Sequence, residues 1–198
     1  MGMEAEDTVA LVRRAQLGHR SSAGCLAEKA RRRLYAYVYR LTLNRDLAQD
    51  QLQETLVKMV ERISDVKHPE RFWAWLFRTA LGNVQHYYRA EAKRQGIAVS
   101  ALTRQRMDEY LCGDCDDGLN RAMRRELARA TARAMTRLPF SHRQVLMLRC
   151  FEQMSFAEIA ETMGGTEMRA RVLFFRARHA LARQLREQGF AEEMPAWH

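Results

Sequence analysis

Hydrophobic residues recur every three to four positions along most of the chain, which is the spacing of one face of an α-helix. In the N-terminal half this pattern predicts helices over residues 7–19, about 22–43, about 46–63 and about 69–94. The third is expected to bury Leu47, Leu52, Leu56, Met59, Val60 and Ile63. The fourth is expected to bury Phe72, Trp75, Leu76, Thr79 and Ala80. Because short polar turns separate the four helices, residues 1–95 are predicted to form one compact bundle.

The helical spacing is interrupted over residues 96–118, which contain three glycines and an acidic cluster, and we interpret this segment as an acidic linker. The helical spacing resumes over residues 119–188, and residues 189–198 form a short tail. Helices are predicted there at 119–137, 141–151, 156–163 and about 167–188. No run of alternating β-branched residues favours a sheet. The predicted fold class is therefore all-α, with two small helical domains joined by a flexible linker.

Charge follows the same division of the chain. Residues 1–95 hold 17 Lys and Arg against 11 Asp and Glu, and residues 121–198 hold 14 against 8. Two basic blocks of this kind suit phosphate backbones, although composition alone equally fits an ordinary soluble basic protein. The acidic N-terminus is not a signal peptide, and no apolar run is long enough to span a bilayer. The four cysteines are not expected to form disulfides, and a cytoplasmic location is predicted.

A helix-turn-helix signature lies near the C-terminus. Ser155 and Glu158 form a capping box, Gly164–Thr166 make a tight turn, and a longer basic helix follows. Small and apolar residues are expected to pack the two helices together: Ile159, Ala160, Met163, Ala170, Phe174 and Ala177. The first turn of the second helix is then free to enter a major groove. The alternative is a helical hairpin with a solvated basic face, and the combined features favour DNA binding over it.

Several segments, in order and spacing, resemble the sigma-70 family of RNA polymerase sigma factors. Leu138-Pro139, Arg143 to Arg149, Ser155 to Ala160 and Phe175 to Leu181 resemble region 4. Arg31 to Thr42, Asp46 to Thr55 and Phe72 to Ala80 resemble regions 2.1, 2.2 and 2.3–2.4. The pattern is that of the extracytoplasmic-function (group IV) class. The resemblance implies a factor that binds core RNA polymerase and directs promoter-specific transcription initiation.

The resemblance also implies sites on the two domains. The polymerase contact, on the β′ clamp, would comprise Asp50, Gln53, Glu54 and Leu56. The −10 element would be held by Lys67, His68, Arg71, Trp73, Arg78, Tyr87, Arg89 and Lys93, with Tyr88 and Arg94 adding stacking surface and charge. The −35 element would be read by Thr166, Glu167, Arg169, Ala170, Arg171, Arg176 and Arg178. Further partners would be the polymerase β flap and an anti-sigma protein.

The sequence departs from the family pattern in places. Gly82 and His86 stand where the family often has Asn and Asp, and Gly82 within a helix is destabilising. The run from Met168 to Phe174 differs from the family's usual start of this helix, with Arg169 replacing a small polar residue and Leu173 replacing an Arg. These differences leave the −35 sequence open.

Two alternatives remain at this point. The first is a stand-alone helix-turn-helix regulator whose N-terminal half senses a ligand or dimerises. The second is a thiol- or zinc-responsive sensor using Cys112 and Cys115, although no second pair completes a zinc site. The histidines show no catalytic grouping and no Gly-rich phosphate loop is present, so no enzyme activity, cofactor or metal is expected. Cys25 and Cys150 are predicted to be small core residues.

Overall fold

A computed structural model describes residues 2–42, 44–96, 126, 130–131, 133–135 and 137–190, with side chains from residue 7 onward. Every regular element in this part of the chain is helical and none is a strand. The predicted all-α class is therefore confirmed. The proposed linker at 96–118 and the tail beyond residue 190 lie outside the described residues, apart from Gly96.

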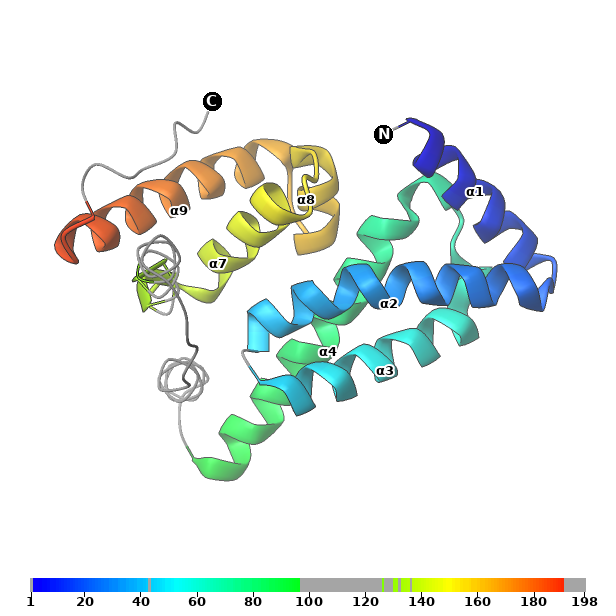
Figure 1. Cartoon of the computed structure of the whole chain (residues 1–198), viewed down its shortest axis with the longest axis horizontal. Coiled ribbons are helices and arrows are strands. Elements are labelled where there is room, and N and C mark those ends of the chain that lie inside the picture. Colours follow the sequence, from blue (N-terminus) through cyan, green and yellow to red (C-terminus); the bar gives the residue numbers. More distant parts are fainter. Residues whose placement is uncertain are drawn as a thin grey trace.

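The N-terminal domain is a bundle of α1 (Gly2–Gln16), α2 (Arg20–Thr42), α3 (Arg45–Arg62) and α4 (Phe72–Gln95). Figure 1 shows α2 and α3 side by side, with α4 crossing them. The centre is filled by large side chains that are fully enclosed: Val12, Leu26, Leu34, Tyr37, Met59, Phe72, Leu76 and Phe77. Burying apolar side chains on this scale supplies most of the stability of such a bundle.

Local sequence signals explain where these helices begin and end. The Asn44 side chain accepts a hydrogen bond from the Leu47 amide at 2.9 Å and so caps the start of α3, close to the predicted start at about residue 46. α2 begins at Arg20, two residues before the predicted start at about residue 22, so Ser22 is buried within the helix. Pro69 opens a short 3₁₀ turn, η2 (Pro69–Arg71), and α4 starts only after it. A second 3₁₀ turn, η1 (Ile63–Asp65), follows α3.

The C-terminal domain contains α7 (Phe140–Leu146), η3 (Met147–Phe151), α8 (Phe156–Met163) and α9 (Glu167–Glu187). The helix predicted at 141–151 is thus an α-helix continued by the five-residue π-helix η3. Its α-helical part begins at Phe140, with Pro139 in the N-cap position. Residues 126, 130–131 and 133–135 are also helical, within the segment predicted as an Arg-rich helix.

The helix-turn-helix packing follows the prediction. The Ser155 hydroxyl accepts from the Glu158 amide, and the Glu158 carboxylate accepts from the Ser155 amide at 2.8 Å, so the capping box is formed. Ile159, Ala160, Ala170 and Ala177 are buried between the helices. The rings of Phe156 and Phe174 meet edge to face at 5.7 Å. These contacts fix the angle between α8 and α9.

The burial pattern differs from the prediction at five apolar positions, one of which, Leu56, is half-buried rather than enclosed. Val60 was expected in the core but is 55% exposed, because Met59 takes the inward position on α3. Trp75 is only half-buried, and its ring lies 6.0 Å from that of Phe72. Cys25 is exposed and Cys150 half-buried, so neither is a fully enclosed core residue.

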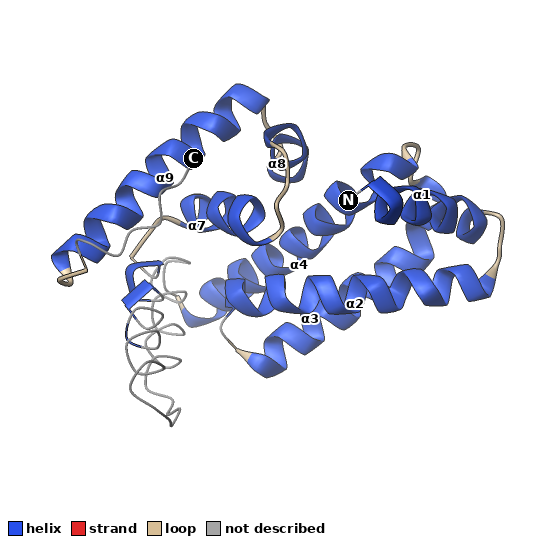
Figure 2. Ribbon diagram, turned by 45° about the horizontal axis from the view of Figure 1, so that its top comes forward, coloured by secondary structure: helices blue, strands red, loops and turns tan. Residues whose placement is uncertain are grey.

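The two domains pack against each other through α4 and α8 (Figures 1 and 2). The Thr162 hydroxyl lies 3.5 Å from the Ala74 carbonyl, and one continuous cluster of buried side chains spans both domains. A second contact joins α2 to the residue after η3. There Arg33 donates to the Glu152 carboxylate at 3.0 Å and to the Glu152 carbonyl at 3.1 Å. We name this pair, with Arg40 at 4.0 Å from the same carboxylate, the Glu152 clasp.

Replacing Gly82 with Ala should raise the free energy of unfolding by about 0.5–1 kcal/mol. Gly82 is exposed within α4, and a Cβ there would meet no atom within 4 Å. Urea denaturation of the two proteins measures the difference. Gly96→Ala is the matched control and should lose stability, because Gly96 closes α4 at a φ of 66°. A midpoint for Gly82→Ala at or below that of the parent protein would contradict this prediction.

Candidate functional surfaces

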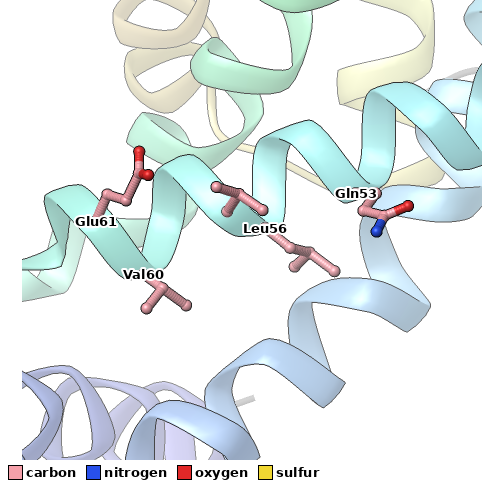
Figure 3. A pocket seen from close by; sticks show the side chains of 5 residues that line it. Gln53, Leu56, Val60 and Glu61 are labelled. Atoms are coloured by element: carbon pink, nitrogen blue, oxygen red, sulfur yellow. The ribbon is translucent and has the colours of Figure 1, made fainter.

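An exposed apolar strip runs along α3. Val57 and Val60 are 51% and 55% exposed, and with Leu56 and two polar neighbours they line a shallow groove of about 340 Å³. Figure 3 shows four of the lining residues along the helix: Gln53, Leu56, Val60 and Glu61. We name this feature the α3 groove. Exposed apolar side chains with polar ones at their edge are typical of a protein-binding surface.

Two of the predicted polymerase contacts, Gln53 and Leu56, line this groove, and Asp50 and Glu54 lie on the same helix outside its lining. Asp50, Gln53 and Glu54 are exposed and Leu56 is half-buried. Glu54 pairs with Lys58 at 2.6 Å, so its carboxylate is held by a neighbour on the same helix. The sequence analysis missed Val57, and it misplaced Val60 in the core. Val57 and Val60 follow Gln53 at steps of four and three residues, and this helical spacing was the available signal for an apolar strip on the outer side of α3.

Lys58 also connects α3 to α4. Its amino group donates to the Asn83 side-chain oxygen at 2.6 Å, and the Asn83 amide donates to the Thr55 hydroxyl at 3.0 Å. Asn83 and Thr55 are both buried. Because a buried polar group is costly without partners, this chain of hydrogen bonds fixes the two helices in one register. The α3 groove is therefore presented on a rigid support.

A basic strip runs along the outer face of α4. Arg71, Arg78, Arg89 and Lys93 are all exposed and recur at intervals of seven, eleven and four residues, which places them on one side of a 3.6-residue helix. We name them the α4 basic strip. His86 and the half-buried Trp75 border the same side, and sequence reasoning did not include them. Trp75 and His86 lie three residues before Arg78 and Arg89, and this helical spacing was the signal in the sequence that places them on the same side of α4.

The predicted stacking residues lie elsewhere on α4. Trp73 is half-buried, and its ring lies 4.6 Å from the Arg33 guanidinium. Tyr87 is half-buried against Tyr88. Tyr88 itself is buried and its hydroxyl lies 3.4 Å from the Thr42 carbonyl, so it offers no surface for stacking, contrary to expectation. The structure thus brings the basic groups together and leaves the aromatic ones toward the core.

The loop before α4 carries the other two predicted −10 residues. Lys67 and His68 are exposed between η1 and η2. A His68 ring nitrogen lies 3.1 Å from the Glu70 carboxylate. The pKa of Glu70 is lowered, first by a hydrogen bond from its own backbone amide and then by His68 and Arg71. Glu70 is therefore ionised at neutral pH beside His68 and Arg71.

The C-terminal domain contacts one end of the α4 basic strip. Arg71 lies 3.8 Å from the Glu161 carboxylate, and Arg78 lies 3.5 Å from the Glu161 carbonyl, although both arginines stay exposed. Arg89 and Lys93 lie at the far end of α4. The C-terminal domain therefore contacts the strip at the end that carries Arg71 and Arg78.

The predicted −35 residues fall into three groups on α9. Thr166 caps the helix, its hydroxyl accepting from the Arg169 amide, and Glu167 pairs with Arg171 at 2.6 Å. Arg169, Arg171 and Arg176 are exposed and Arg178 is half-buried. Ala170 is a correction: it is 5% exposed and packs between the two helices of the motif, so its side chain does not face a groove.

The sequence analysis missed three exposed apolar residues on the outer side of α9. Met168, Val172 and Phe175 are 69%, 41% and 57% exposed. Their spacing of four and three residues places them on one side, opposite the buried Ala170 and Ala177. This periodicity was visible in the sequence.

His142 on α7 lies near Arg176 of α9, and its environment predicts that the stability of the protein depends on pH. Desolvation, with the nearby charge of Arg176, lowers its pKa below the ordinary 6.5. As the pH falls, His142 is therefore protonated in the unfolded chain before it is protonated in the folded protein. The contribution of His142 to stability falls as the pH drops below about 6.5. Thermal unfolding between pH 8 and 5 should show a steeper loss for the parent than for His142→Gln. Parallel curves would contradict this.

No group of three or more His, Cys, Asp and Glu side chains in the described part of the chain is placed to hold a metal ion. Cys112 and Cys115, the basis of the sensor alternative, lie outside the described residues. Burial raises the pKa of the Cys150 thiol, which lowers its reactivity. None of the helices described is both long and apolar enough to cross a bilayer.

The fold and these surfaces define a two-domain helical protein with a helix-turn-helix. The family model for Sigma-70 region 2 matches residues 26–94, and that for Sigma-70 region 4 matches residues 134–183. The chain belongs to the sigma-70 family of RNA polymerase sigma factors, in the extracytoplasmic-function class. Members of this family bind core RNA polymerase and direct promoter-specific initiation of transcription.

Individual relatives agree with this assignment. The chain is 26% identical over 170 residues to RNA polymerase sigma factor YlaC of Bacillus subtilis, covering 84% of this chain and 94% of that protein. It is 25% identical to the ECF RNA polymerase sigma-E factor of Haemophilus influenzae, covering 89% and 94%. Among solved structures, CnrH in complex with the cytosolic domain of CnrY is similar with a TM-score of 0.64 at 24% identity, covering 91% and 98%.

Proposed function

We propose that this sigma factor docks on core polymerase through the α3 groove, holds the opened −10 strand on the α4 basic strip and reads the −35 element with α9. The observation that carries the proposal is the position of the α3 groove. It is an exposed apolar surface within the region 2 match, at the residues expected to contact the polymerase clamp. Val57 and Val60 extend that contact beyond Asp50, Gln53, Glu54 and Leu56.

The packing of the domains adds a condition to −10 binding. Arg71 and Arg78 are exposed but lie against Glu161, so binding phosphates with their full charge would compete with these contacts. We propose that α8 separates from α4 when the protein binds polymerase and DNA. The predicted division into residues 1–95, a linker at 96–118 and residues 119–188 fits such a separation, and it stays a proposal. An anti-sigma partner is likewise a proposal, and the structure of CnrH in complex with the cytosolic domain of CnrY supports it.

The test is reconstituted transcription. The purified protein is mixed with bacterial core polymerase and fragmented bacterial DNA, and the 5′ ends of the transcripts are sequenced. Starts at a fixed distance downstream of a shared two-part motif support the proposal. Absence of defined starts, together with tight footprints by the protein alone, would instead establish a stand-alone regulator.

A further inference from the structure

The outer side of α9 consists of an apolar ridge between two rows of arginine. We name Met168, Val172 and Phe175 the α9 ridge. At about 100° per residue, Arg169 and Arg176 lie on one flank of the ridge, and Arg171 and Arg178 lie on the other. The helix as a whole carries six Arg and two Glu, so it is strongly basic.

We propose that the α9 ridge reads thymine methyl groups in the −35 element, while the flanking arginines hold the phosphates of the two strands. This inference rests on the proposed function. It assigns sequence readout to Met168 and Val172, which were absent from the predicted site, and gives the arginines mainly a positioning role.

The geometry of a major groove fits this arrangement. The groove admits one α-helix, with the outermost side of the helix against the base edges and its flanks toward the two backbones. The ridge spans seven residues, or about 10 Å, which matches about three base pairs. Thymine is the base that presents a methyl group in this groove, and apolar side chains contact it without leaving a polar group unpaired.

The contacts of the arginines support the division of roles. Arg171 pairs with Glu167 and its guanidinium lies 4.9 Å from the Phe156 ring, so it is held to the side of the helix. The Arg178 guanidinium lies 5.9 Å from the Phe175 ring. Phe175 packs against His179 at 4.3 Å between ring centroids, which stiffens the end of the ridge farthest from the helix start. Met168 and Val172, nearer the start, are the base-reading positions.

Charge distinguishes DNA from a protein partner on this ridge. A protein that covered it would need an apolar centre with acidic groups along both edges. A major groove supplies thymine methyls between two rows of phosphates and satisfies both requirements at once. Basic residues on both flanks therefore favour DNA as the occupant.

The test removes the methyl groups alone. The holoenzyme first selects active promoters from a library with a randomised −35 region. Each thymine of the selected element is then replaced by deoxyuridine, which lacks only the methyl. Initiation should fall about fourfold for each contacted methyl group. This factor is the transfer free energy of one such group, about 0.8 kcal/mol, converted at 1.4 kcal/mol per tenfold change.

Variants of the ridge complete the experiment. In Val172→Ala and Met168→Gln, thymine and uracil templates should differ by less than about twofold at the contacted position. Met168→Leu keeps an apolar side chain and should keep the preference for thymine. Selected elements without thymine, equal use of both templates, or ridge variants with unchanged selectivity would overturn the proposal. A holoenzyme with no defined starts would instead refute the proposed function itself.

Discussion

The Val57→Asp, Val60→Asp double variant should lose core polymerase binding by at least a hundredfold and initiate almost no transcripts. Both side chains are about half exposed in the free protein and would be covered in the docked one. Burying an apolar side chain of this size stabilises a contact by about 1.5–3 kcal/mol, and a carboxylate left unpaired in the same place is unfavourable. A total of about 3 kcal/mol is more than a hundredfold in affinity.

The design separates docking from folding. Val57 and Val60 make no enclosed contacts, so the variant should unfold at nearly the parent temperature. Leu17→Asp is the matched control: Leu17 is 79% exposed in the turn between α1 and α2 and does not line the α3 groove, so its variant should bind normally. Affinity is measured with fluorescently labelled protein and core polymerase. Parent-like binding by the double variant would place the docking surface elsewhere.

Local sequence signals predicted local structure well. Asn44 and the Ser155–Glu158 pair cap their helices through contacts made within three residues, and such contacts depend on little else. The helical period also predicted the helix-turn-helix core correctly. The period does not resolve adjacent apolar residues, however. Met59 and Val60 both fit the inner side of α3, and only the packing of the neighbouring helices decides which one turns inward.

Functional surfaces were harder to predict because two kinds of information were missing. Resemblance favoured charged residues on α9, so the exposed apolar ridge at Met168 and Val172 was overlooked, and the buried Ala170 was included. Contacts between the domains were also invisible. Arg33 and Glu152 lie 119 positions apart, and no local pattern indicates that Glu161 of α8 contacts Arg71 and Arg78. Such contacts arise only once both domains have folded.

Arg33→Met should lower the free energy of unfolding by about 2 kcal/mol and loosen the contact between the domains. The Glu152 side chain is only 7% exposed, and without Arg33 its nearest cation is Arg40 at 4.0 Å. Removing one partner of a buried pair costs about 3–5 kcal/mol, and we expect less here because Arg33 is one-third exposed. Urea denaturation measures stability, and small-angle X-ray scattering measures the expansion.

A second substitution distinguishes a lost ion pair from lost packing. In the Arg33→Met, Glu152→Gln double variant no charge is left unpaired at the clasp, so much of the stability should return although the attraction between the domains is gone. Arg32→Met is the matched control, since Arg32 pairs with Glu28 on the exposed surface and its loss should leave the stability nearly unchanged. If the double variant is as unstable as Arg33→Met alone, the loss comes from the packing of Arg33 on Trp73 and Phe77 rather than from the stranded carboxylate.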